Sequence, residues 1–247
     1  MITSRDNNVF KMLKQLKKDK QYLFLDNPKL VEEASSAGFE IEYAIVADTA
    51  KCDFDYITKN AKQIATMSSS LFDSFTTTCT SQGIVGVVKN KQQKMEKPQG
   101  NFLILDNLQD PGNVGTLLRS ALGAGFSDVY LIDCVNILNE KLVRSSMGAV
   151  FKLNIYESSK EEFLNFFSKK FEKSNIFVAD MSGENVFSTQ VDSQFGIILG
   201  NEGNGVSKEM YQIANKVVKI PMKNNLESLN VAVAGSILMF ELSKNIF

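Results

Sequence analysis

The sequence predicts an α/β protein whose larger part is a mostly parallel sheet covered by helices on both faces. Short, nearly continuous apolar segments alternate with helix-like segments along most of the chain, as is typical of parallel strands that are buried on both sides. Polar, glycine-bearing segments follow three of these strands, where ligands bind in such sheets. Residues 231–242 are apolar on nearly every side, so this terminal helix must be covered by its own domain, a second copy of the chain, or both.

The first series of elements predicts a small α/β domain. Residues 7–18 have the pattern of a basic helix with one apolar side. Asn27 and Pro28 mark the start of a second helix, because asparagine caps helices and proline is favoured at their first position. Gly38 ends that helix. The expected helices are residues 7–18, 28–37, 54–62 and 70–75, and the expected strands are residues 22–25, 41–47, 64–67 and 84–88.

A polar linker, rich in lysine and glutamine, occupies residues 89–100. Such segments usually separate domains, so we expect one domain at residues 1–95 and another at residues 101–247. The expected strands of the second domain are residues 102–105, 129–132, 151–156, 176–179, 196–199 and 217–220, and its helices are residues 113–124, 141–146, 160–171, 207–214 and 231–242.

The composition limits the class of protein. A hydrophobic fraction of 44% and a charged fraction of 22% are those of a globular protein. The N-terminus lacks the apolar stretch of a signal peptide, and the longest apolar run is too short to span a membrane. Cys52, Cys79 and Cys134 are odd in number and far apart. They fit neither a disulfide framework nor a zinc site, so we expect a cytoplasmic protein without a metal.

The charges contain two informative features. There is no histidine, which excludes Ser-His and Cys-His catalysis. Arginine occurs only at Arg5, Arg119 and Arg144, while lysine supplies the other positive charges. An arginine in so lysine-rich a chain could be needed for its planar guanidinium, which draws attention to Arg119 and Arg144. The net charge of −1 gives no indication of nucleic-acid binding. Local lysine clusters suit phosphate contacts, although a solvated face is the commoner explanation.

Three loops contain the candidate chemistry. In residues 105–121, Pro111 and Gly112 form a turn and Asn113 is the expected helix cap. Arg119 follows six residues later, so both could face one cleft, or serve as a cap and a surface arginine. Residues 199–205, Leu-Gly-Asn-Glu-Gly-Asn-Gly, hold three glycines but match neither phosphate-binding glycine motif. The third loop covers residues 220–230.

Together and in this order, the three loops resemble the SpoU/TrmH branch of the SPOUT RNA methyltransferases, of the ribosomal-RNA type. Residues 101–245 resemble its catalytic domain, and residues 20–88 resemble its ribosomal-protein-like domain that binds RNA substrate, preceded here by the basic helix. The resemblance implies a deep trefoil knot, which general topology rules disfavour. It also implies a homodimer with the active site at the subunit contact. Both features would account for a buried terminal helix.

The resemblance further implies methyl transfer from S-adenosylmethionine to a ribose 2′-hydroxyl of RNA, with ribosomal RNA favoured over transfer RNA. Each motif carries over residue by residue. The implied catalytic residues are Asn113, Arg119, Glu202, Ser228 and Asn230. The implied cofactor-binding residues are Leu199, Gly200, Asn201, Ile220, Met222 and Leu229. The expected RNA-binding residues are Arg144, in a segment that faces nucleic acid in the family, and Lys14, Lys17 and Lys18 of the basic helix.

The sequence departs from the family pattern and leaves alternatives open. Asn224 replaces a usual glycine, and asparagine is the residue that best tolerates a positive φ after glycine. We therefore expect that loop to persist. Ala232 replaces a usual serine, which we expect to be neutral. Arg119 could act as a base or as a bidentate phosphate clamp. The alternative functions are transfer-RNA methylation and RNA binding without catalysis, which need not involve the cofactor.

Overall fold

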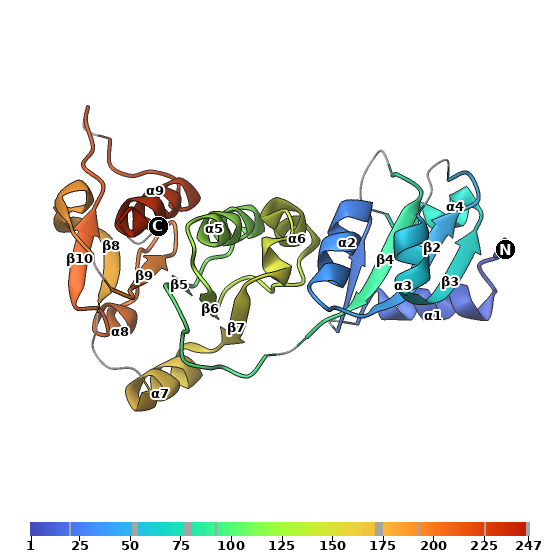
Figure 1. Cartoon of the computed structure of the whole chain (residues 1–247), viewed down its shortest axis with the longest axis horizontal. Coiled ribbons are helices and arrows are strands. Elements are labelled where there is room, and N and C mark those ends of the chain that lie inside the picture. The colour runs from blue at the N-terminus through green and yellow to red at the C-terminus, as the bar shows by residue number, and fades with distance from the viewer. Residues whose placement is uncertain are drawn as a thin grey trace. The chain divides into compact units, whose positions relative to one another are not determined.

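The computed structural model describes residues 1–19, 21–50, 54–76, 81–91, 93–170, 175–191, 193–224 and 226–245, without the side chains at 169 and 170. Cys52 and Cys79 lie outside these residues. The chain divides into two compact units, Met1–Gln92 and Gln93–Phe247 (Figure 1). Each unit is described by itself below.

The N-terminal unit is a four-stranded mixed sheet with helices on both faces. In the strand order β1-β4-β2-β3, β4 is antiparallel to β1 and β2, while β2 and β3 are parallel. Phe10 and Leu13 of α1 share a core with Val85 and Val87. Gly86 faces Val31 of α2 on the other side, with no room for a side chain. The elements are α1 (Asn8–Leu16), β1 (Tyr22–Leu25), α2 (Pro28–Ser36), β2 (Ile41–Ala47), α3 (Asp55–Asn60), β3 (Ala61–Met67), α4 (Ser69–Phe72) and β4 (Ile84–Lys89).

The C-terminal unit contains a six-stranded sheet in which every pairing is parallel, as expected for the larger sheet. The strand order is β10-β8-β9-β5-β6-β7. The strands are β5 (Phe102–Asp106), β6 (Asp128–Ile132), β7 (Asn154–Ser158), β8 (Ile176–Asn185), β9 (Gly196–Gly200) and β10 (Lys216–Lys219). The helices are α5 (Pro111–Gly123), α6 (Glu140–Ser146), α7 (Lys160–Lys170), α8 (Lys208–Tyr211) and α9 (Val231–Ser243), with short 3₁₀ turns η1 (Ala149–Phe151) and η2 (Val186–Ser188).

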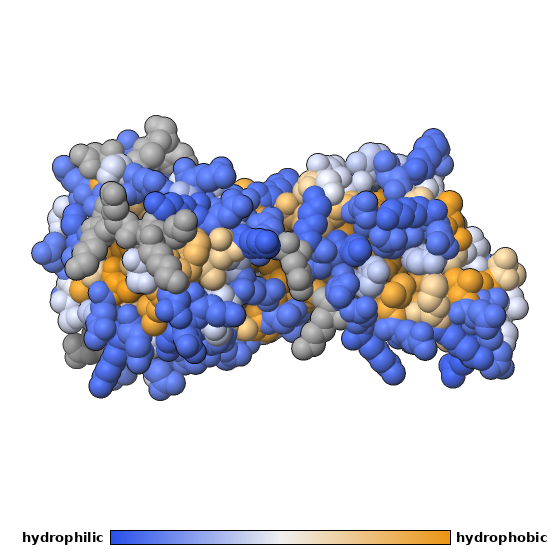
Figure 2. All heavy atoms as spheres, turned by 90° about the horizontal axis from the view of Figure 1, so that it is seen from below, coloured by the Kyte–Doolittle hydropathy of each residue, from blue (hydrophilic) through white to orange (hydrophobic). Residues whose placement is uncertain are grey.

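The helices cover both faces of the parallel sheet (Figure 1). Phe163 of α7 and Met210 of α8 pack with Tyr130 of the sheet in one core. On the other face, Gly235 of α9 lies against Leu117 of α5 and Leu199 of β9, where a methyl group would come within 2.4 Å of either side chain. Close packing of α5, α9 and β9 brings the ends of three distant segments together. Figure 2 shows the side that carries α7, which is mainly hydrophilic with separate hydrophobic patches.

Several element boundaries differ from those expected. Residues 61 and 62, expected at the end of a helix, belong to β3 together with residue 63, because Ala61 pairs with Ile41. The strand expected at residues 151–156 begins at Asn154, because residues 149–151 form η1. The helix expected at 207–214 is confined to Lys208–Tyr211. In each case pairing or packing with distant residues overrides the local pattern.

Strand β8 has an unpaired stretch that the sequence pattern did not predict. Val178 pairs with Val217, but the next residue of β10, Val218, pairs with Glu184. Residues 179–183 therefore lie outside the ladder between β8 and β10. We refer to residues 179–183 as the β8 bulge. Gly183 is required there, because a side chain would come within 2.5 Å of the Val218 backbone nitrogen.

The terminal helix α9 is covered on one side only. Leu238, Met239 and Leu242 are buried against the rest of the unit. Val233 and Phe240 are 50% and 48% exposed, although a helix that is apolar on all sides should have no solvent-exposed face. The domain therefore supplies only part of the cover that this sequence requires.

Candidate active site

Three side chains from three segments that are distant in sequence form a hydrogen-bonded chain. The Asn113 Nδ2 group on α5 donates to Glu202 Oε1, 2.8 Å away, in the loop after β9. Asn230 Nδ2, at the start of α9, donates to Asn113 Oδ1 at 3.0 Å. Asn113 and Asn230 are 117 residues apart in sequence. The fold thus brings together three residues expected in one site, and we call them the amide relay.

The direction of the amide relay is set by the backbone of α9. Asn230 is the N-cap, and its Oδ1 accepts from the amides of Ala232 at 2.9 Å and Val233 at 3.4 Å. Backbone amides can only donate, so the Nδ2 group of Asn230 must be the end that meets Asn113. Asn113 then accepts through its oxygen and donates to Glu202. The carboxylate of Glu202 is consequently the acceptor at the end of the relay.

The sequence had indicated Asn113 as the cap of α5, but Asn113 does not cap this helix. Its side chain is therefore available for the amide relay. The helix begins two residues earlier, at Pro111, and Asp110 is its N-cap. Asp110 Oδ1 accepts from the Asn113 amide at 2.9 Å, and its other oxygen lies 3.0 Å from Lys141 Nζ. The Asn113 backbone bond, followed by Lys141, holds the pKa of Asp110 below its usual value.

Arg119 lies on the exposed side of α5, two turns after Pro111. Within the described ranges it makes no hydrogen bond or ion pair, so its guanidinium is open to a ligand. The adjacent Ser120 hydroxyl is 2.7 Å from that of Ser236 on α9. Arg119 therefore lies beside the α5–α9 contact, while direct contact with the amide relay is not seen.

A cavity next to the third loop collects four of the predicted residues. Ile220, Met222, Ser228 and Leu229 all line it. Residues 220–222 and 226–230 are in neither helix nor strand, and apolar side chains from both segments line the cavity. Such a wall suits a flat, mostly apolar base with polar edges. The lining also includes Ala179, Asp180 and Met181 of the β8 bulge, which sequence analysis missed.

The remaining predicted cofactor residues build the loop after β9. Leu199 is buried, and Gly200 cannot carry a side chain because a methyl group would lie 2.2 Å from the Gly205 carbonyl carbon. Asn201 Nδ2 donates to the Asn107 carbonyl at 2.9 Å. Its Oδ1 accepts from the Gly203 amide at 2.9 Å. These three residues shape the loop that carries Glu202, rather than lining the cavity.

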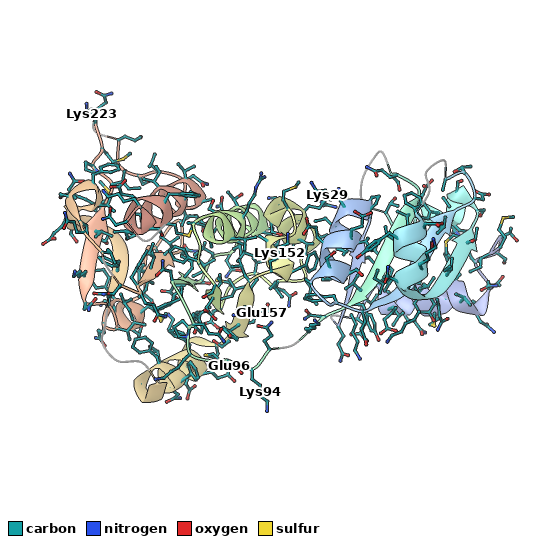
Figure 3. All side chains as sticks on the ribbon, in the orientation of Figure 1. Lys29, Lys94, Glu96, Lys152, Glu157 and Lys223 are labelled. Carbon is teal, nitrogen blue, oxygen red and sulfur yellow. The ribbon has the colours of Figure 1, made fainter. Side chains whose placement is uncertain are left out.

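The third loop has the backbone conformation that its asparagine was expected to tolerate. Asn224 has a φ of 58°, in the left-handed region that costs most other residues about 1–2 kcal/mol. Figure 3 shows the neighbouring Lys223 at the outer end of this segment, pointing away from the sheet.

This conformation gives a testable prediction. Asn224→Gly should leave unchanged the affinity for S-adenosylmethionine, the cofactor that the family resemblance implies, because glycine adopts a positive φ without strain. Asn224→Ala should weaken that affinity about tenfold, which corresponds to a strain of about 1.4 kcal/mol. Titration calorimetry on both variants would measure the difference. Equal affinities in the glycine and alanine variants would contradict it.

The described part of the chain offers little else for covalent or metal chemistry. Burial raises the pKa of the Cys134 thiol to about 12, so it stays protonated and is a poor nucleophile. No group of three or more metal-ligating side chains occurs among the residues described. Among the same residues, no helix is sufficiently long and apolar to cross a membrane.

Two of the expected RNA-binding lysines are engaged within the N-terminal unit. Lys14 Nζ donates to the Ser74 carbonyl at 2.9 Å and lies 4.9 Å from the Phe75 ring centre. Lys17 Nζ donates to the Phe75 carbonyl at 3.2 Å. Burial, then neighbouring positive charges, lowers the pKa of Lys14. Lys18 is exposed, and Arg144 is half-buried in the last turn of α6.

Comparisons with known proteins place this geometry among RNA-modifying enzymes. Residues 100–240 match the model of the SpoU rRNA Methylase family. The chain is 30% identical over 220 residues to the 23S rRNA (guanosine(2553)-2′-O)-methyltransferase RlmP of Bacillus subtilis, covering 88% of this chain and 87% of the relative. It is 32% identical over 153 residues to the 23S rRNA (guanosine-2′-O-)-methyltransferase RlmB of Xanthomonas campestris, covering 60% of each.

A solved structure shares the fold over the whole chain. The AdoMet-bound rRNA methyltransferase from Sinorhizobium meliloti superposes with a TM-score of 0.85 and covers 100% of this chain and 98% of its own. The sequence identity is 22%, so this likeness concerns the fold alone. The mostly parallel sheet with flanking helices is therefore the fold expected from the three loops.

Proposed function

The chain belongs to the SpoU rRNA Methylase family, and on that premise we propose that it methylates a ribose 2′-hydroxyl of ribosomal RNA with S-adenosylmethionine. The observation that carries the proposal is the amide relay Asn230–Asn113–Glu202, next to a loop whose Ile220, Met222 and Leu229 line a cavity. A non-catalytic RNA-binding protein would not need both features.

The cavity fits the cofactor by the chemistry of its lining. Apolar side chains suit an adenine base, and Ile220, Met222 and Leu229 would hold it. When bound there, S-adenosylmethionine supplies a methyl group on a sulfonium. Leu199, Gly200 and Asn201 would act indirectly, because they fix the loop that carries Glu202 and do not line the cavity.

The residues of the chain must prepare the ribose hydroxyl, which is a weak nucleophile at neutral pH. Arg119, exposed on α5, would orient the target phosphate and hydroxyl through its planar fork or accept the proton. Ser228 and Asn230 would position the ribose. Glu202 accepts the hydrogen bond of Asn113 and so fixes the end of the relay.

The unit Met1–Gln92 would hold the RNA substrate, as the family resemblance implies, and the threading of the C-terminal segment through a knot remains part of the proposal. Ribosomal RNA as substrate implies that the protein acts in the cytoplasm.

The function is tested by incubating the purified protein with radiolabelled-methyl S-adenosylmethionine and total RNA from a strain that lacks the gene. A single labelled 2′-O-methyl nucleotide in the ribosomal fraction is expected. Label confined to transfer RNA would contradict the proposal that ribosomal RNA is the substrate. Absence of label together with absence of cofactor binding would favour an RNA-binding protein.

A homodimer explains the incomplete cover of α9. Val233 and Phe240 on this helix are exposed, and so is Leu122 on the neighbouring α5. A second copy would bury these apolar groups, each worth about 1.5–3 kcal/mol when fully buried. Phe240→Glu should therefore convert a dimer to a monomer in light scattering. A wild-type monomer at micromolar concentration would contradict the proposal.

The salt dependence of RNA affinity should come from a small set of lysine and arginine side chains. The logarithm of the association constant should fall linearly with the logarithm of salt concentration. Lys18→Gln and Arg144→Gln should each reduce the slope by about 1. Lys14→Gln should leave the slope unchanged, because its ammonium already binds the Ser74 carbonyl. Filter binding at several salt concentrations measures all three, and a salt-independent affinity would refute the assignment.

A further inference from the structure

A buried carboxylate at the end of β5 holds the far end of the loop that carries Glu202. We propose that Asp106, with Lys160 as its counter-ion, is a positioning residue for Glu202. This inference rests on the proposed function, since it assigns a role to Asp106 within the same site.

Asp106 is the last residue of β5, and its side chain is 2% exposed. Its Oδ2 accepts from the backbone amide of Ser207 at 2.7 Å, a short distance typical of a charge-assisted hydrogen bond. Among the described residues, no group hydrogen-bonds to Oδ1. A charge buried so deeply needs compensation.

Lys160 provides this compensation. Its Nζ lies 3.8 Å from Asp106 Oδ1 and 3.9 Å from Glu209 Oε2. Lys160 is 30% exposed, so its ammonium reaches from the surface of α7 towards the buried carboxylate. Glu209 is 59% exposed and is already stabilised by water. Of the two acidic partners, Asp106 depends on the lysine more.

The loop after β9 is fixed to the end of β5 at two points. Near its start, Asn201 Nδ2 donates to the carbonyl of Asn107, which has a φ of 59°. At its far end, the Ser207 amide donates to Asp106. Glu202 lies between these two attachments, and its carboxylate is 2.8 Å from Asn113. Loss of one attachment should allow the loop, and Glu202 with it, to drift from Asn113.

The first test measures the attachment without cofactor or RNA. Hydrogen exchange of the peptide 200–207 is compared in the wild type, Lys160→Met, Lys160→Arg and Glu209→Gln. We expect faster exchange in Lys160→Met, because an uncompensated buried carboxylate moves towards water and releases the Ser207 amide. Lys160→Arg should restore protection, and Glu209→Gln should resemble the wild type. Unchanged exchange in Lys160→Met would overturn the proposal.

The second test asks whether Lys160 acts through Glu202. In a double-mutant cycle, kcat is measured for Lys160→Met, Glu202→Gln and the combination. Displacement of a positioned group by about 1 Å costs up to about 10²-fold, so Lys160→Met should lose about tenfold or more in kcat. The double variant should be no slower than Glu202→Gln, because coupled residues are not additive.

Multiplied losses in the double variant would overturn the positioning role, even with faster exchange. If the wild type methylated no RNA, the proposed function would fail. The exchange comparison would still decide whether Asp106 and Lys160 hold the loop, so the two failures are distinguishable.

Discussion

Replacement of Arg119 by lysine should lower methyl transfer by about 10²–10⁴-fold, the usual contribution of a positioned base or acid. The chain has no histidine that could substitute. Arg119 is exposed on α5, and in the described part of the structure its guanidinium makes no competing hydrogen bond. Lysine keeps the charge but loses the planar fork. Single-turnover transfer of radiolabelled methyl groups, at saturating RNA and cofactor, measures the loss.

RNA affinity separates the two roles that are open for Arg119. If the residue acts on the hydroxyl, Arg119→Lys should bind RNA as well as the wild type does. Arg144→Lys is the matched control, because that arginine lies on α6 outside the amide relay. The control should weaken RNA binding and leave the single-turnover rate at saturation unchanged. Loss of affinity and of turnover in parallel in Arg119→Lys would indicate a phosphate clamp alone.

Gly200→Ala should abolish most of the activity through the backbone. A methyl group at this position would lie 2.2 Å from both the Gly205 carbonyl carbon and the Val206 nitrogen, and neither backbone atom can rotate away. The loop must shift, which carries Glu202 away from Asn113. We expect at least a 10²-fold loss of turnover and a fall of about 1–3 kcal/mol in the free energy of unfolding.

Gly203→Ala is the control in the same loop. Its added methyl group would meet Asn201 Oδ1 at 3.5 Å, an ordinary contact. This variant should retain the stability and turnover of the wild type. Chemical denaturation and single-turnover assays on both variants would check the contrast. Equal activity of the two alanine variants would show that the shape of the Gly200–Gly205 turn is unimportant.

The sequence predicted the parallel sheet because its strands are apolar on both faces, a pattern that needs no knowledge of distant contacts. Its errors fall where distant residues decide. Asn113 was expected to cap α5, whereas Asp110 does so, and both residue types are good caps. Which of the two caps the helix depends on which side chain has hydrogen-bond partners in other segments. Asn113 has such partners, Glu202 and Asn230.

Three features of the two units had no local signal in the sequence. The β8 bulge lines the cavity only because β8 and β10 change register. Asp106 ends a strand and gave no indication that it binds Ser207 across 101 residues of sequence. Lys14 and Lys17 were expected to bind RNA, and the local sequence did not indicate that they also donate to the carbonyls of residues 74 and 75. In each case the chemistry depends on a tertiary neighbour.

The side-chain amide of Asn230 has two separate structural roles. Its oxygen starts α9, and its nitrogen starts the amide relay. Aspartate would keep the cap but lose the donor to Asn113, whereas alanine would lose both, with the cap alone worth about 1 kcal/mol. Alanine at this position would therefore disable the site and weaken the terminal helix together, whereas aspartate would disable the site alone. Descendants of this protein that lose the activity should replace Asn230 by aspartate more readily than by alanine.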